Sequence, residues 1–172
     1  MRNYTTKSFD YSRDFSTIDF RLHPELYQIG RGEQGVLMVE PYKSEILPSW
    51  KFRTPDIALV SAKKIFSLFK KYKKEHDFVG MDMARKFLQM GYTRARRYAN
   101  HASGKKYVSN PQLESTPDKE KVTRKKLIPQ SKDWATNEKA ESARIYYEYY
   151  KKAANDTKYG EMKKEHMVKY SQ

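Results

Sequence analysis

The sequence predicts an α+β fold: one predominantly α-helical domain with a short strand or hairpin in the N-terminal third of the chain. Apolar residues recur at helical spacing between positions 55 and 75, which is typical of an amphipathic helix. The apolar run Val36–Val39 has β-branched residues at both ends and is closed by Pro41, as a short buried strand is. A length of 172 residues suits one domain, and 14% aromatic residues argue against wholesale disorder.

The N-terminal part is expected to be irregular apart from the predicted strand. Residues 1–14 are expected to form a flexible polar arm in front of a core domain at 15–104. Pro24 opens a predicted short helical turn over residues 22–27. The glycine-punctuated stretch 29–35 is predicted to be a loop that leads into the strand.

Three helices are predicted in the core domain. Thr54-Pro55 combines an N-cap residue with proline at the first helical position, so a helix should run from there to about Glu75. A second helix is predicted over residues 81–90, ended by Gly91. Thr93 is expected to cap a third helix that continues to about Ser103 and is ended by Gly104.

The remaining residues are predicted to form two regions. Residues 105–136 contain three prolines and several polar residues, which indicates a basic, extended connector. Residues 137–172 are expected to form a C-terminal helical region that packs on the core.

Composition excludes several classes of protein. There is no cysteine, so neither a disulfide framework nor a thiolate metal site is available. The first twenty residues are interrupted by charges, unlike a signal peptide, and no apolar run approaches the roughly 18 residues of a membrane helix. We expect a cytoplasmic protein with no membrane partner and no cofactor.

The positive charge is unevenly distributed along the chain. The formal net charge is +14, yet residues 1–50 carry six Lys/Arg and seven Asp/Glu. Residues 51–76 carry eight and two, and no acidic residue occurs from Met83 to Leu113. Such asymmetry favours a polyanionic partner, because Lys and Arg displace condensed counterions from phosphates. A basic surface without a dedicated partner is the alternative.

The stretch GYTRARRYANHASGKKY, residues 91–107, contains the main candidate contacts. Arginine forks match phosphate oxygens or guanine, asparagine can pair with adenine, and tyrosine can stack on unpaired bases. Flanking basic residues would widen the electrostatic surface. The predicted nucleic-acid-binding residues are Arg94, Arg96, Arg97, Lys105, Lys106, Arg85, Lys86, Asn100, His101, Tyr98 and Arg31.

Two known phosphate-binding or DNA-binding patterns resemble parts of the chain. Two predicted helices joined at Gly91 and Thr93 resemble the turn of helix-turn-helix proteins. Phe87, however, stands where that pattern has a small residue. The loop of residues 30–35 has the glycines of a phosphate-binding loop but lacks its lysine-hydroxyl ending. Left-handed backbone in a tight turn is the alternative explanation for these glycines.

We therefore expect a small nucleic-acid-binding protein whose contacts are mainly to phosphate and only weakly sequence-selective. The partner would be DNA or RNA, bound where cationic side chains of different helices converge. One alternative is a protein-interaction module that binds an acidic protein surface. The other is a metal-dependent enzyme acting on nucleic acid through Glu33, Glu40 or Asp82, although these carboxylates show no converging spacing.

Two long motifs resemble a known family. They are GRGEQGVLMVEPYKSEILPSWKFRTP, residues 30–55, and DFVGMDMARKFLQMGYTRARRYANH, residues 77–101. Both are similar to the domain of unknown function 4385 family, which comprises small bacterial and bacteriophage proteins. The similarity extends from Phe9 to about Arg144. It implies a bacterial or phage source, and hence a bacterial or phage-infected cytoplasm, but no particular activity.

Overall fold

The secondary-structure elements of residues 9–172, the part of the chain that the computed structural model describes, are all helices. The six α-helices are α1 (Tyr42–Ile46), α2 (Pro55–Lys74), α3 (Phe78–Asn100), α4 (Pro117–Lys125), α5 (Glu138–Ala154) and α6 (Thr157–Lys169). No strand occurs in these residues, and the predicted α+β class is therefore wrong. Most of the predicted N-terminal arm lies outside the described residues, but Phe9 is buried in the core.

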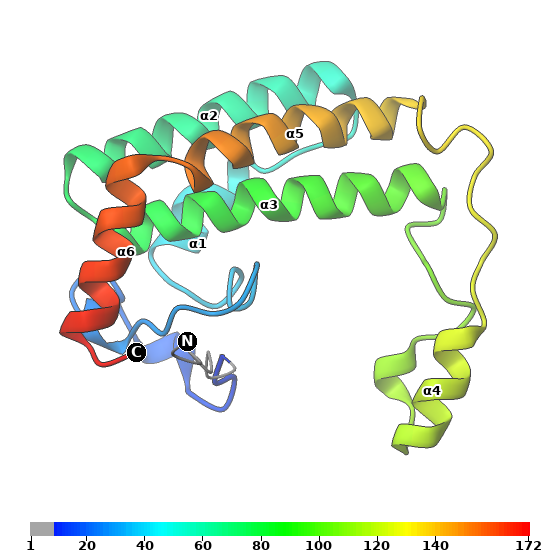
Figure 1. Cartoon of the computed structure of the whole chain (residues 1–172), viewed down its shortest axis with the longest axis horizontal. Helices are drawn as coiled ribbons and strands as arrows, with labels where there is room; N and C mark the ends of the chain where they lie inside the picture. The colour runs from blue at the N-terminus through cyan, green and yellow to red at the C-terminus, as the bar shows by residue number, and fades with distance from the viewer. Residues whose placement is uncertain (1–8) are drawn as a thin grey trace, which may run out of the picture.

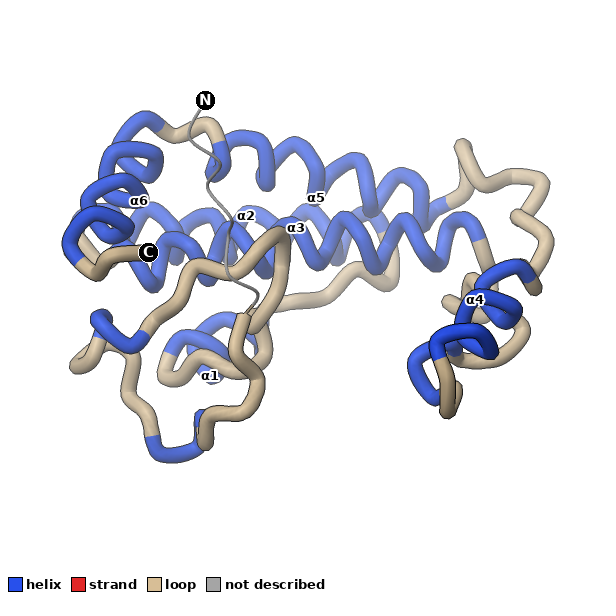
Figure 2. Tube along the Cα trace, turned by 60° about the horizontal axis from the view of Figure 1, so that its bottom comes forward, coloured by secondary structure: helices blue, strands red, loops and turns tan. Residues whose placement is uncertain are grey.

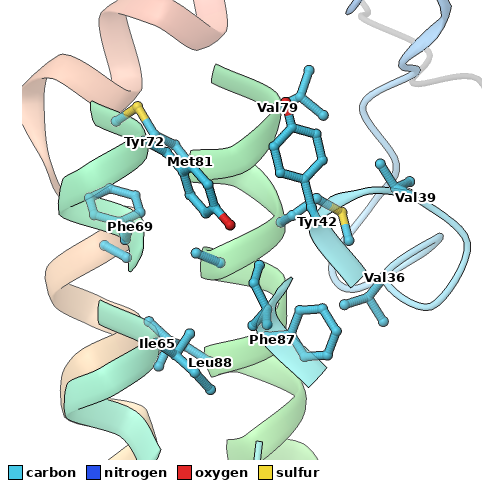
Figure 3. Packing of buried hydrophobic residues seen from close by; sticks show 14 of the residues in the cluster. Val36, Val39, Tyr42, Ile65, Phe69, Tyr72, Val79, Met81, Phe87 and Leu88 are labelled. Carbon is cyan, nitrogen blue, oxygen red and sulfur yellow. The ribbon is translucent and has the colours of Figure 1, made fainter. Parts of the chain in front are cut away.

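Three long helices form the body of the protein. Helices α2, α3 and α5 pack against one another in pairs, with α3 antiparallel to both neighbours (Figure 1). Thr54 accepts a hydrogen bond from the backbone of Ile57 and Pro55 occupies the first turn, which confirms the predicted start of α2. Figure 3 shows side chains such as Ile65, Phe69 and Leu88 filling the space between α2 and α3.

The predicted strand is a series of turns. The backbone N–H groups of Val36 and Met38 bond to carbonyls three residues earlier, at 3.2 and 3.0 Å. Gly32 and Gly35 have φ values of 61° and 76°, which are accessible to glycine at little cost. Val36 and Val39 are buried beside α1 and α3 (Figure 3), so the apolar run serves the core without strand pairing.

One continuous helix, α3, replaces the two that Gly91 was predicted to separate. Gly91 lies within α3, where a Cβ would stand 2.2 Å from Cδ1 of Tyr146 on α5. This glycine therefore allows close approach of two helices and does not end one. The hydroxyl of Thr93 donates to the carbonyl of Met90 and to Glu33, so it is not an N-cap. The helix-turn-helix interpretation is wrong because there is no turn.

The segment between α3 and α5 contains a small lobe. Its parts are the 3-10 helix Pro111–Leu113, α4, and a single antiparallel bridge between Tyr107 and Leu127. The lobe lies beyond the end of α3, away from the three-helix body (Figures 1 and 2). Helix α6 packs at the opposite end, against the first turns of α3. Within residues 9–172, none of the helices combines the length and apolar character that crossing a bilayer requires.

Candidate nucleic-acid interface

A basic groove of about 630 Å³ separates the last turns of α3 from the lobe. Its walls come from α3, the loop after α3, and α4, with one residue from the glycine loop. The charged residues that line it are Arg94, Arg97, Lys105, Lys106, Arg124 and Glu33. Five cations and one carboxylate thus share one concave surface, which is hereafter called the basic groove.

Helix α3 contributes Arg94 and Arg97. Both are exposed, and residues three apart on a helix lie on adjacent positions of the same face. Neither guanidinium forms an ion pair with any carboxylate of residues 9–172. Glu33, the one acid of the groove, accepts a hydrogen bond of 2.9 Å from Thr93. The two arginines are therefore available to an external anion.

The lobe side of the groove is held in place by backbone pairing. Gly104 has a φ of 71° and turns the chain directly before Lys105 and Lys106. The carbonyl of Lys106 accepts from the backbone of Ile128 at 2.9 Å, and Val108 donates to the carbonyl of Lys126 at 3.0 Å. This pairing fixes the backbone at Lys106, and both lysines line the groove together with Arg94 and Arg97 of α3.

Tyr107 and Arg124 form the other wall of the basic groove. Tyr107 belongs to the stretch whose tyrosines were expected to stack on bases, whereas Arg124 is a lining residue that sequence reasoning missed. The Arg124 guanidinium carbon lies 5.9 Å from the centre of the Tyr107 ring, and Lys106 lies 5.5 Å from it. A hydrogen bond from Arg124, with the nearby charge of Lys106, lowers the pKa of the Tyr107 hydroxyl. Glu120 pairs with Arg124 from the side. The run Arg124-Lys125-Lys126 was a signal for this wall, but it falls in a segment predicted to be an extended connector.

Two of the predicted contact residues instead hold the connector against α3. Arg96 donates to the side chain of Asn100 at 2.9 Å and to the carbonyl of Trp134, and it lies over the Trp134 ring. The carbonyl of Asn100 accepts from Ser131 at 2.7 Å. These groups position the lobe and do not line the groove.

The model of the family described as domain of unknown function (DUF4385) matches residues 10–169. The chain belongs to this family. No curated protein and no solved structure matches it.

Two other predicted contact residues of this DUF4385 protein lie outside the basic groove: Tyr98, which is 39% exposed, and His101, which is buried. Tyr98 lies between Phe52, with ring centres 5.9 Å apart, and Gly104, where a Cβ would stand 2.6 Å from the tyrosine ring. His101 follows the last turn of α3 and is buried, and no hydrogen-bond partner of its Nδ1 lies within residues 9–172. Neither side chain lines the basic groove.

Arg85 and Lys86 belong to the core, so the expectation that they widen the phosphate-binding surface is wrong. Arg85 is 8% exposed and Lys86 is fully buried. Both pair with Asp82, at 2.9 and 3.7 Å. Their spacing of three and four residues from Asp82 along α3 brings all three side chains together inside the protein.

Arg31 lies outside the basic groove, and the three candidate catalytic carboxylates do not gather into one site. Arg31 is exposed on the glycine loop and lines a different cavity from the basic groove. Glu40 accepts from the backbone of Ser44, and Asp82 is buried in the core. Within residues 9–172, no three His, Asp or Glu side chains gather as a metal site would require.

Proposed function

We propose that this DUF4385 protein binds nucleic acid through the basic groove, mainly by contacts to phosphate. The observation that carries the proposal is the gathering of five cations and one carboxylate around a single groove. Phosphate contacts supply most of the affinity of such surfaces, and they carry little sequence information. A bacterial or phage-infected cytoplasm is the proposed setting, because the nucleic acid of these cells is found there.

The aromatic wall favours contact with unpaired bases. Tyr107 is partly exposed in the groove and is flanked by two cations, an arrangement in which a base could stack on the ring while its phosphate meets Lys106. Stacking of a base on an aromatic side chain contributes about 1–3 kcal/mol. We therefore propose that single strands bind more tightly than duplexes of the same length.

The test is the salt dependence of binding, measured by fluorescence anisotropy with labelled single-stranded and duplex DNA and RNA. Replacing Arg94 and Arg97 with alanine should weaken binding at least about tenfold, since a hydrogen bond to a charged group contributes on the order of 1.5–3 kcal/mol. The slope of log K against log salt should fall by about 1.4 for single strands, at about 0.7 per phosphate contact.

Lys63 and Lys64 provide the matched control. Both are exposed on α2, and replacing them with alanine removes the same formal charge away from the groove. This control should retain most of the affinity and slope. Equal losses in the two variants would show that binding depends on net charge alone, and no binding by the wild type would remove the proposed function.

Exposed apolar residues of the lobe favour a second candidate, a surface for an acidic protein. Leu113 is 83% exposed and Val108 is 67% exposed, next to the basic groove, and Val122 and Leu127 are also exposed. A protein partner could cover these side chains while its acids meet the groove. Affinity capture from nuclease-treated lysate separates the two candidates. A partner that survives digestion and is lost when Leu113 is replaced by serine favours protein.

A further inference from the structure

A buried charge cluster lies at the end of α3 that is farther from the lobe. Asp82 is fully buried, and its Oδ1 accepts from the hydroxyl of Tyr159 at 2.6 Å and from Nε of Arg85 at 2.9 Å. The hydroxyl of Tyr27 donates to Oδ2, which also lies 3.7 Å from Nζ of Lys86. Burial alone would raise the pKa of Asp82, but Arg85 and Lys86 outweigh it and hold the pKa well below its usual range. The single carboxylate of Asp82 thus pairs with the cations of both Arg85 and Lys86.

Arg85 also faces a cavity. Its Nη1 donates to Gln89 at 2.9 Å and its Nη2 to the carbonyl of Gly32 at 3.2 Å, and all three residues line the cavity. Arginine carries five N–H groups. Among the described residues, the second N–H of Nη1 has no hydrogen-bond acceptor, although the side chain is nine-tenths buried. Among the described residues, this buried guanidinium therefore keeps one N–H without an acceptor at a position that lines the cavity.

The cavity measures about 720 Å³, and its rim is positively charged. Arg13, Arg31 and Lys163 join Arg85 around it, and Glu25 is the one acidic residue of the lining. None of the three rim cations forms an ion pair within residues 9–172, whereas Glu25 is engaged by His23 at 3.0 Å. These three cations are therefore available to bind an anionic ligand.

Hydrogen bonds between distant segments hold the walls together. Gln172 donates to the carbonyl of Tyr27 at 2.6 Å and accepts from the backbone of Ile29 at 2.9 Å. Nε2 of His166 lies 3.0 Å from the same Tyr27 carbonyl. These contacts tie α6 and the last residues to the segment that precedes the glycine loop. A preformed wall reduces the ordering cost of binding a ligand.

We infer that this cavity is a second binding site, separate from the basic groove, for a phosphorylated small molecule of nucleotide size. The volume lies in the range of about 300–1,000 Å³ usual for small-molecule sites. A guanidinium matches the oxygens of a phosphate, and the rim cations suit its second charge. Tyr150 and Tyr170 also line the cavity and are partly buried, so the lining includes two aromatic rings against which a planar group could pack. No residue lines both the cavity and the groove.

Calorimetric titration of the full chain with AMP, ribose 5-phosphate and adenosine tests the inference. AMP should bind saturably, ribose 5-phosphate about tenfold more weakly, and adenosine more weakly still. Absence of saturable binding by both phosphorylated probes at millimolar concentration would overturn the proposal. Adenosine that binds as tightly as AMP would overturn it too, because the phosphate would then contribute nothing.

Two variants locate the site. Gln89→Glu keeps the shape of the side chain that accepts from Arg85, but it adds a carboxylate that pairs with Arg85 and repels phosphate. It should retain the thermal stability of the wild type and lose at least tenfold in AMP affinity. Arg31→Gln with Lys163→Gln should give a similar loss, while Arg94→Gln with Arg97→Gln should leave AMP affinity within twofold.

The opposite pattern refutes the assignment. Unchanged AMP affinity in Gln89→Glu would show that Arg85 does not meet the ligand, and a loss only in the Arg94/Arg97 variant would place AMP in the groove. Anisotropy with an oligonucleotide keeps this test independent of the proposed function. Gln89→Glu should leave oligonucleotide binding within twofold, and AMP binding should persist even if no oligonucleotide binds.

Discussion

Gly91 provides the strictest test of how α3 and α5 meet. A Cβ at this position would lie 2.2, 2.3 and 2.6 Å from three ring atoms of Tyr146, whereas ordinary contacts fall between 3.4 and 4 Å. The Tyr146 side chain is fully buried, and its hydroxyl donates to the carbonyl of Lys51 at 2.8 Å. The ring therefore cannot move aside without breaking that hydrogen bond or separating the two helices.

Gly91→Ala should consequently destabilise the protein. Overpacking a core costs about 1–3 kcal/mol, and a clash with a tethered ring belongs at the upper end of that range. The higher helix propensity of alanine offsets about 1 kcal/mol of this loss in the free energy of unfolding. The expected net loss is about 2 kcal/mol, which for a chain of this size lowers Tm by about 4–8 °C.

Gly160 on α6 is the matched control, and urea or thermal unfolding followed by circular dichroism is the assay. Apart from its chain neighbours and the adjacent backbone of α6, no heavy atom lies within 4 Å of a Cβ built at Gly160, so Gly160→Ala should gain about 0.5–1 kcal/mol from helix propensity. The two variants should move stability in opposite directions. An equal gain in Gly91→Ala would refute the close approach of α5 to α3.

Three further predictions concern the charge cluster, a buried histidine and the connector. Asp82→Asn should lower the free energy of unfolding by about 3–5 kcal/mol at neutral pH, because it leaves two buried cations without a carboxylate. The lowered pKa of Asp82 stabilises the folded wild type at pH values above the usual pKa of a carboxyl group, and this stabilisation is lost as the pH falls through the folded pKa. Urea unfolding of the variant should therefore depend less on pH in acid than that of the wild type. Burial lowers the pKa of His166, so the wild type should lose stability as the pH falls below about 6.5. In thermal unfolding, the Tm of His166→Gln should depend less on pH over this range. Equally steep dependence of Tm on pH in the two proteins would contradict this. Arg96→Ala should speed hydrogen exchange around Trp134 while lowering global stability by no more than about 1 kcal/mol, and unchanged exchange would show that the connector is held by other contacts.

Sequence reasoning succeeded where the signal was local. The start of α2 was readable because Thr54-Pro55 satisfies an N-terminal N–H and fixes the first φ without help from distant residues. Gly91 was misread because its partner, Tyr146, is far away in sequence and nothing near the glycine indicates the contact. Val36–Val39 was misread because a short apolar run is equally compatible with a strand and with a buried turn.

The candidate site was predictable in part, for a similar reason. The acid-free segment pointed to Arg94, Arg97, Lys105 and Lys106, and the structure brings these four to one groove. Arg85 belongs to the same segment, yet it is buried and paired with Asp82, which lies one residue before the acid-free segment begins. A count of charges along the chain records which residues are basic but not which of them face solvent.

The continuity of α3 links these findings to binding. Because one helix runs from the buried charge cluster to Arg94 and Arg97, the core fixes where those two arginines stand. The opposite wall of the groove has weaker support: a single β-bridge joins its two segments, and its attachments to the end of α3 include the hydrogen bonds of Arg96, Ala99 and Asn100 to the connector. Elements with few buried contacts open at lower free energy than a packed core. A ligand that enters the basic groove is therefore expected to displace the lobe more readily than α3.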